Sequence, residues 1–196
     1  MRDIDWNRRV VWVEPADEPG RSRWAGSGAA LSLEVSQAIR SVLCGDGRLD
    51  AHVSMRAATK LAEIRADYDW AREGRTTLVR ESARSRSRWW TFAGARANQA
   101  IASALDAGGA PTMAVDDLGI GLRTTIGPEE LKSITSEIDA RTLRAPVASQ
   151  RLDTLKFASC VPDPALEQML ADRDADVRAV AAVLGEPLNS AGLVRD

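Results

Sequence analysis

Residues 76–92 read TTLVRESARSRSRWWTF, two strand-forming runs on either side of a polar turn. Residues 76–80 and 88–92 are rich in Thr, Val, Trp and Phe, which favour strands. The ESARSRS segment between them is typical of a turn. We therefore predict a β-hairpin, followed by a break at Gly94 and a helix that starts near Arg96.

A second hairpin is predicted downstream of that helix. The helix has a buried stripe at helical spacing: Ala97, Ile101, Ala104 and Leu105. Residues 112–115 and 120–125 then form strands around the turn Asp116-Asp117-Leu118-Gly119. Pro128 begins a further helix.

The rest of the chain is predicted to be mostly helical. Residues 9–13 read as a strand and residues 17–28 as a loop. Ser32 is the expected N-cap of a helix in which Val35, Ala38, Ile39, Val42 and Leu43 recur at helical spacing. A longer helix over residues 54–73 has the stripe Ala57, Ala58, Leu61, Ile64, Tyr68 and Ala71. Two short helices follow Asp163, and the tail from Pro187 is expected to be loose.

Hairpins and helices alternate here without a βαβ rhythm. This order favours an α+β fold, an antiparallel sheet built of hairpins with helices packed on it. We expect residues 1–142 to form an α+β domain and residues 143–196 to form a short C-terminal helical segment that packs on it.

Composition excludes several classes of protein. Hydrophobic residues make up 44% of the 196 residues, which is enough for a core, but no apolar run is long enough to span a membrane. The first residues have no signal-peptide core, so we expect a cytoplasmic protein without a membrane partner. The net charge of −2 provides no overall attraction to nucleic acid, so any basic surface has to be local.

Motifs for catalysis and metal binding are missing. None of the three lysines follows a glycine, so the chain has no phosphate-binding loop of the GxxxxGK[ST] kind. The single histidine, His52, and two distant cysteines cannot form a zinc site. Asp116-Asp117 has the oxygen ligands of a cation site but is better explained as turn chemistry. We expect no catalytic residue and no metal site.

The positive signal is the run RSRSRWW, residues 84–90. Arginines at alternating positions of a strand point to one face, where they can contact phosphates while a tryptophan stacks on a base. The alternative is a solvated hairpin tip with at least one tryptophan in the core. The candidates for nucleic-acid contact are Arg84, Arg86, Arg88, Trp89, Trp90 and Arg96, with Arg21, Arg23 and Trp24 from a similar loop as a second group. Arg96 and Asn98 have a structural alternative, which is to hold the turn that leads into the helix.

Five segments, in this order along the chain, resemble the region that follows the motor in large helicase-related (Lhr-type) DNA helicases of superfamily 2, sometimes called the DEAD/DEAH-associated domain. They are VVWVEPADEPGRSRWAGSG (10–28), LSLEVSQAIRSVL (31–43), RWWTFAGARANQAIASAL (88–105), AVDDLGIGLR (114–123) and LKFASCVPDPALEQMLADRDAD (155–176). The resemblance covers nearly the whole chain, although no single motif is specific and none is catalytic.

The resemblance implies an accessory role in DNA unwinding and repair. Single-stranded DNA or an RNA–DNA hybrid and the helicase motor domains are the expected partners. This chain contains no motor motif, so we expect a fragment, a split-gene subunit or a remnant. ATP and Mg²⁺ belong on the motor domains, and no cofactor or activity is expected of this chain alone. The alternatives are a structural protein-interaction subunit without nucleic-acid affinity and, least favoured, a small enzyme.

Overall fold

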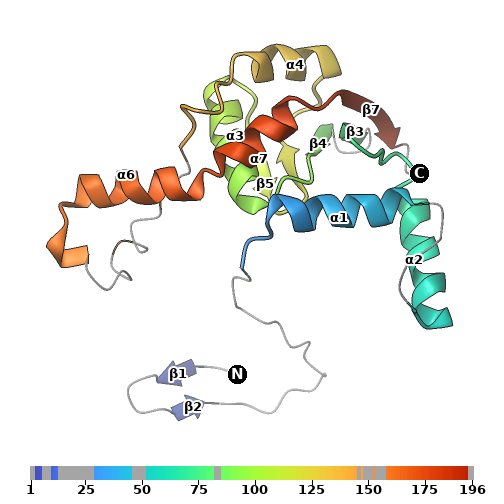
Figure 1. The fold of residues 1–196 in the computed structure, drawn as a ribbon, viewed down its shortest axis with the longest axis horizontal. Helices are drawn as coiled ribbons and strands as arrows, with labels where there is room; N and C mark the ends of the chain where they lie inside the picture. The colour runs from blue at the N-terminus through green and yellow to red at the C-terminus, as the bar shows by residue number, and fades with distance from the viewer. Residues whose placement is uncertain are drawn as a thin grey trace.

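The computed structural model describes residues 3–5, 10–12, 29–45, 52–81, 85–144, 147, 152 and 158–193. Among them are a short hairpin of β1 (Asp3–Asp5) and β2 (Val10–Trp12), a five-stranded sheet and the helices that surround that sheet (Figure 1). No helix in these ranges is long and apolar enough to cross a membrane.

The larger sheet has the order β5-β6-β4-β3-β7 and gives the chain the predicted α+β fold. Its strands are β3 (Thr76–Glu81), β4 (Arg86–Trp90), β5 (Thr112–Val115), β6 (Gly119–Leu122) and β7 (Leu188–Leu193). The two predicted hairpins, β3–β4 and β5–β6, are both present, and β6 pairs antiparallel with β4 to join them.

Strand β7 is a correction, because the tail from Pro187 was expected to be loose. It pairs parallel with β3, from Thr76 opposite Leu188 to Glu81 opposite Leu193, so the sheet is mixed instead of purely antiparallel. The sequence LNSAGL has little strand propensity of its own. The segment therefore becomes a strand because the edge of β3 offers it hydrogen-bonding partners. This tertiary contact outweighs the low strand propensity of its own residues.

One face of the sheet packs against helices α3 (Ala95–Ala107), α4 (Pro128–Ser136) and α7 (Val177–Leu184). The strands contribute Leu78, Trp89, Ile120 and Leu122 to this main core. Helix α7 contributes Ala179, Val180 and Val183 to it. Figure 1 shows α3 and α7 crossing beside the sheet, with α4 above them. The C-terminal segment thus adds both a helix and a strand to the same core and sheet.

Helix α1 (Leu33–Cys44) has the predicted N-cap, since the Ser32 hydroxyl accepts a hydrogen bond from the Val35 amide. Its buried side is not the apolar one. Ser36 and Arg40 are fully buried, whereas 47% of Val35 and 42% of Val42 is exposed. Of the five apolar residues at helical spacing, Ile39 and Leu43 are half-buried and the other three are exposed, because this side of the body offers hydrogen-bond acceptors to Arg40.

Helix α2 (Met55–Asp67) is shorter than predicted and has no buried residue. Of its predicted apolar face, Ala57, Ala58 and Ile64 are exposed, Leu61 and Tyr68 are half-buried, and Ala71 is buried. The chain leaves the helix at Tyr68, and Trp70 and Ala71 pack on the second face of the sheet. Figure 1 shows α2 pointing away from the sheet beyond the end of α1.

A single turn of 3₁₀ helix (Ala158–Cys160) precedes α6 (Asp163–Asp174), which begins where predicted. Leu166 and Leu170 are buried, but Met169 is half exposed. Figure 1 shows α6 extending to the side of the sheet opposite α2.

Candidate nucleic-acid interface

Strand β4 alternates strictly between the two faces of the sheet. Ser87 and Trp89 are buried, while Arg86, Arg88 and Trp90 are half-buried on the other side. The prediction that alternating arginines share one face is therefore confirmed for Arg86 and Arg88. We call the face that holds Arg86, Arg88 and Trp90 the arginine face.

Trp89 does not belong to this surface. It is 3% exposed and lies in the main core, together with Leu78 and Ile120 of the adjacent strands. A base cannot reach a ring in that position while the fold is intact, so Trp89 is removed from the candidates. The expectation that at least one tryptophan of the pair lies in the core is confirmed.

Trp90 is the centre of an aromatic cluster on the arginine face. Its ring centroid lies 5.3 Å from that of Tyr68 in an edge-on arrangement and 5.1 Å from that of Trp70. Phe92 follows at 6.1 Å. Such tilted and edge-on geometries are favourable for aromatic pairs. The cluster fixes the plane of Trp90 and closes part of its surface to solvent.

Arg88 lies over the Trp90 ring, with its Cζ atom 4.3 Å from the ring centroid. Its Nη2 donates to both carboxylate oxygens of Asp116, at 2.7 and 2.6 Å. The side chain keeps 22% of its exposure. The Arg88 charge is thus compensated within the protein, and its guanidinium lies over an indole ring.

Asp116 is placed for this contact by the turn between β5 and β6. Its Oδ1 also accepts hydrogen bonds from the amides of Leu118, at 3.0 Å, and Gly119, at 3.1 Å. This is the turn chemistry that the sequence predicts. The turn is tied to α3 as well, because Asn98 Nδ2 donates to the Asp116 carbonyl at 2.8 Å and Asn98 Oδ1 accepts from Thr91 at 2.6 Å. Asn98 therefore has the structural role proposed as its alternative.

Asp117 fixes the opposite side of the same turn. Its Oδ1 accepts hydrogen bonds from the amides of Leu31, at 2.8 Å, and Ala95, at 3.1 Å. One carboxylate therefore joins the segment that leads into α1, the start of α3 and the β5–β6 turn. Both aspartates are used in structural hydrogen bonds, and in the described ranges no group of three or more His, Cys, Asp or Glu residues could hold a metal ion.

Met113 extends the arginine face toward β5. Its sulfur lies 4.0 Å from Nη1 of Arg86. A Cβ atom on Gly121, which is opposite Arg88 in the ladder, would come within 3.1 Å of Met113 Cγ. The missing side chain at Gly121 therefore leaves room for Met113 to lie against β6, beside the row of arginines.

The remaining candidates do not join this row. Arg96 is exposed in the first turn of α3 and makes no ion pair within the part of the chain that the structure describes. Arg21, Arg23, Trp24 and Arg84 lie outside the described residues. His52 is exposed between α1 and α2. The arginine face thus brings together Arg86, Arg88 and Trp90 from the sequence-based list and adds Met113.

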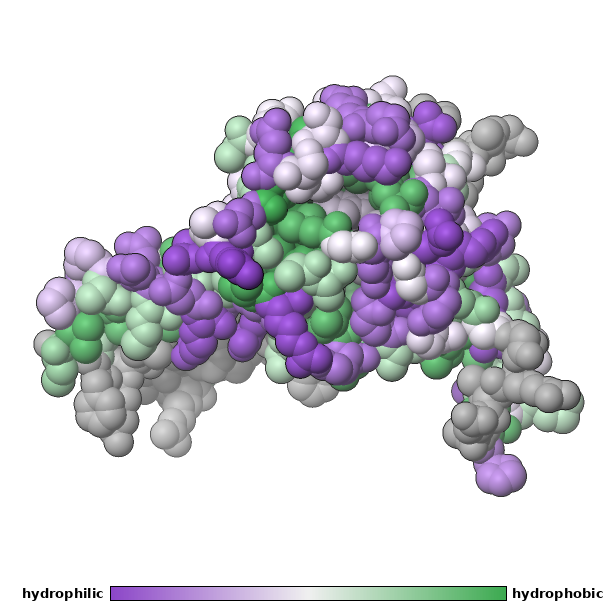
Figure 2. Space-filling view, turned by 45° about the horizontal axis from the view of Figure 1, so that its top comes forward, coloured by the Kyte–Doolittle hydropathy of each residue, from purple (hydrophilic) through white to green (hydrophobic). Residues whose placement is uncertain are grey.

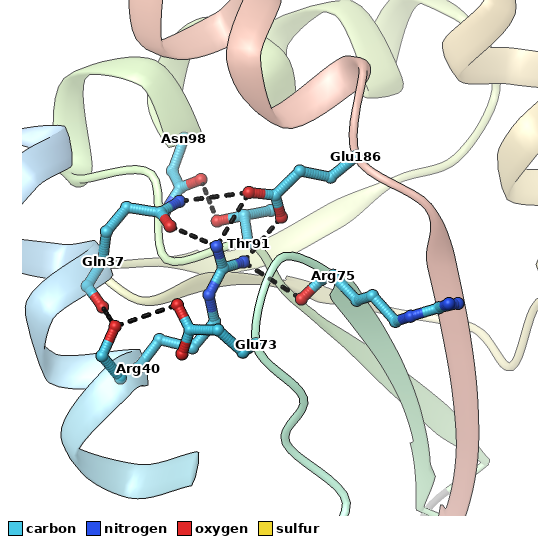
Figure 3. Close-up of polar contacts among 8 residues, drawn as sticks. Gln37, Arg40, Glu73, Arg75, Thr91, Asn98 and Glu186 are labelled. Atoms are coloured by element: carbon cyan, nitrogen blue, oxygen red, sulfur yellow. Dashed lines mark hydrogen bonds and ion pairs between the residues drawn. The ribbon is translucent and has the colours of Figure 1, made fainter. Parts of the chain in front are cut away.

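Sequence reasoning missed a second polar cluster, centred on Arg40 (Figure 3). Nη1 of Arg40 lies 2.6 Å from Glu186 Oε2 and 3.1 Å from the Arg75 carbonyl oxygen, and Nη2 lies 2.8 Å from Glu186 Oε1. Nη2 also bonds to Gln37. Figure 3 shows Gln37 and Arg40 pointing from α1 toward Glu186, in the segment between α7 and β7. No local motif signals this cluster, because Glu186 lies 146 residues from Arg40 along the chain.

No protein-family model, no curated protein and no solved structure matches this chain. A function therefore has to be inferred from the chemistry of the surfaces instead of from similarity of fold.

Proposed function

We propose that this chain is an accessory region that binds single-stranded nucleic acid, of the kind that follows the motor of Lhr-type DNA helicases. The observation that carries the proposal is the arginine face, where Arg86, Arg88 and a fixed Trp90 lie on one side of β4. Single-strand-binding surfaces combine cations along the backbone with flat groups on which bases stack. The ordered resemblance of five segments to the helicase region supports the same reading.

In this proposal the chain contributes binding and support but no chemistry. ATP and Mg²⁺ are bound by the motor domains, which are its protein partner in the same gene product or in a separate chain. Single-stranded DNA or an RNA–DNA hybrid is the nucleic-acid partner, and the cytoplasm is the compartment. Because the net charge of the chain is −2, affinity has to come from the local basic face.

The test is fluorescence anisotropy with a labelled single strand over a range of salt concentrations. Loss of one phosphate contact lowers the slope of log affinity against log salt by about 1, and we expect this of Arg86→Ala. Arg178→Ala is the matched control, because this substitution removes one positive charge from α7, on the other side of the sheet. Equal slopes for the two variants and the unmodified chain would contradict phosphate contact at the arginine face.

A second function, protein interaction without nucleic-acid affinity, is favoured by a different observation. Helix α1 exposes Val35 and Val42 while it buries Ser36 and Arg40. Figure 2 shows further hydrophobic surface near the middle of the body. Exposed apolar patches of this kind are typical of interaction surfaces. For this second function the unmodified chain should bind no single strand, and Val35→Asp with Val42→Asp should abolish its binding to the motor chain in size-exclusion chromatography.

A further inference from the structure

Arg88 is poorly arranged to grip a phosphate. A guanidinium forks a phosphate with two adjacent N–H groups, either Nη1 with Nη2 or Nε with Nη2. Both forks use Nη2, which Asp116 already occupies with two contacts, at 2.7 and 2.6 Å. The Nε atom is buried and has no hydrogen-bond partner in the described part of the chain. A phosphate would therefore have to displace Asp116 first.

Arg88 is better arranged to stack against a flat ring. The Arg88 guanidinium lies over the Trp90 ring, with its Cζ atom 4.3 Å from the ring centroid, and its Nη2 atom is paired with Asp116. Trp90 is itself held by Tyr68 and Trp70. The Arg88 side chain stays 22% exposed, and neither Trp90 nor Asp116 accounts for the side of the guanidinium turned away from Trp90. Met113, which is exposed, provides a polarizable thioether on the same face of the sheet.

We propose that the outer side of the Arg88 guanidinium is a stacking site for one unpaired nucleobase, with Trp90 below it and Asp116 holding it in plane. This inference rests on the proposed function and assigns Arg88 to the base, leaving phosphate contact to Arg86. Unstacked bases pack on guanidinium planes as they do on aromatic rings. Asp116 compensates the Arg88 charge without covering the outer side of the guanidinium. The site therefore favours a flat ring over a negatively charged phosphate.

The first test needs no variant. The whole chain is titrated with a labelled single strand and with an abasic strand of equal length and charge. Stacking of one base is worth roughly tenfold in affinity, so the intact strand should bind about tenfold more tightly than the abasic one. Equal affinities for the two strands would overturn the stacking site while leaving phosphate binding, and the proposed function, in place.

The second test compares Arg88→Lys with Arg86→Lys. Lysine keeps the charge and can still pair with Asp116, but it has no plane. Arg88→Lys should lose about tenfold affinity for the intact strand and none for the abasic strand, whereas Arg86→Lys should change neither. An Arg88→Lys chain that binds the intact strand as tightly as the unmodified chain would overturn the inference. If the unmodified chain bound neither strand, that result would contradict both the proposed function and the stacking site.

Discussion

At the scale of single residues, Arg40 is a buried side chain that ties α1 to the rest of the molecule. It is 1% exposed, and its ion pair with Glu186 reaches the segment just before β7. Breaking a buried ion pair from one side leaves the other charge without a partner. Arg40→Ala should therefore lower the free energy of unfolding by about 3 kcal/mol in a denaturant titration.

The exposed pair between Arg178 and Glu34 is the control for this prediction. It measures 3.4 Å, and both side chains are largely in solvent. Such pairs contribute at most about 1 kcal/mol, so Arg178→Ala should have little effect on unfolding. If the two variants lost the same stability, Arg40 would not be the link that the structure indicates.

The two cysteines should differ in reactivity. Burial, and then the nearby Glu73 carboxylate, raise the pKa of the Cys44 thiol above its ordinary value. Cys160 is exposed. Because the thiolate is the reactive form, iodoacetamide at about pH 8 should alkylate Cys160 before Cys44, as followed by peptide mass spectrometry. Denaturant should abolish the difference, and equal rates in the folded chain would contradict the placement of Cys44.

At the scale of secondary-structure elements, Gly94 controls how closely α1 approaches α3. It has a φ of +86°, and a Cβ atom there would collide with the Leu31 carbonyl oxygen. Gly109 has a similar φ of +85° but open space around its Cα. Gly109→Ala should cost only the backbone strain, about 1 kcal/mol. Gly94→Ala should cost at least about 2 kcal/mol more, from strain plus the displacement of the segment before α1.

Thermal and denaturant unfolding of both glycine variants measure this difference. Equal losses would show that the segment before α1 does not press on Gly94 as described.

Elements with a strong local signal could be predicted from the sequence. Both hairpins, α3 and the Ser32 cap follow from alternation, turn residues and capping. Strand β7 could not be predicted, since its residues have little preference for a strand and it forms only beside β3. The reversed burial of α1 could not be predicted either, because it depends on Glu186, far along the chain.

The candidate site was predictable to a similar degree. Alternation in RSRWW correctly places Arg86 and Arg88 together, but it cannot say which of two adjacent tryptophans faces the core. That choice depends on which face α3 and α7 cover. The pairing of Arg88 with Asp116 depends on register between β4 and the β5–β6 turn, which only the folded sheet sets.

At the scale of the whole molecule, the sheet has two unlike faces. One is sealed by α3, α4 and α7, and the other presents arginines, an aromatic cluster and Met113. Helix α1 exposes Val35 and Val42, and α2 has no buried residue, so both helices add apolar surface to the chain. The proposed nucleic-acid contact and the alternative protein contact therefore involve different residues.

The location of a bound strand tests the central claim most directly. A single strand that carries photoreactive 5-iodouracil is cross-linked to the whole chain, and the modified peptides are identified by mass spectrometry. We predict cross-links in the peptides that contain Trp90 and Met113, because these side chains border the guanidinium of Arg88 and the side chain of Arg86. Cross-links confined to α1 and α2, or none under conditions where the strand is bound, would contradict binding at the arginine face.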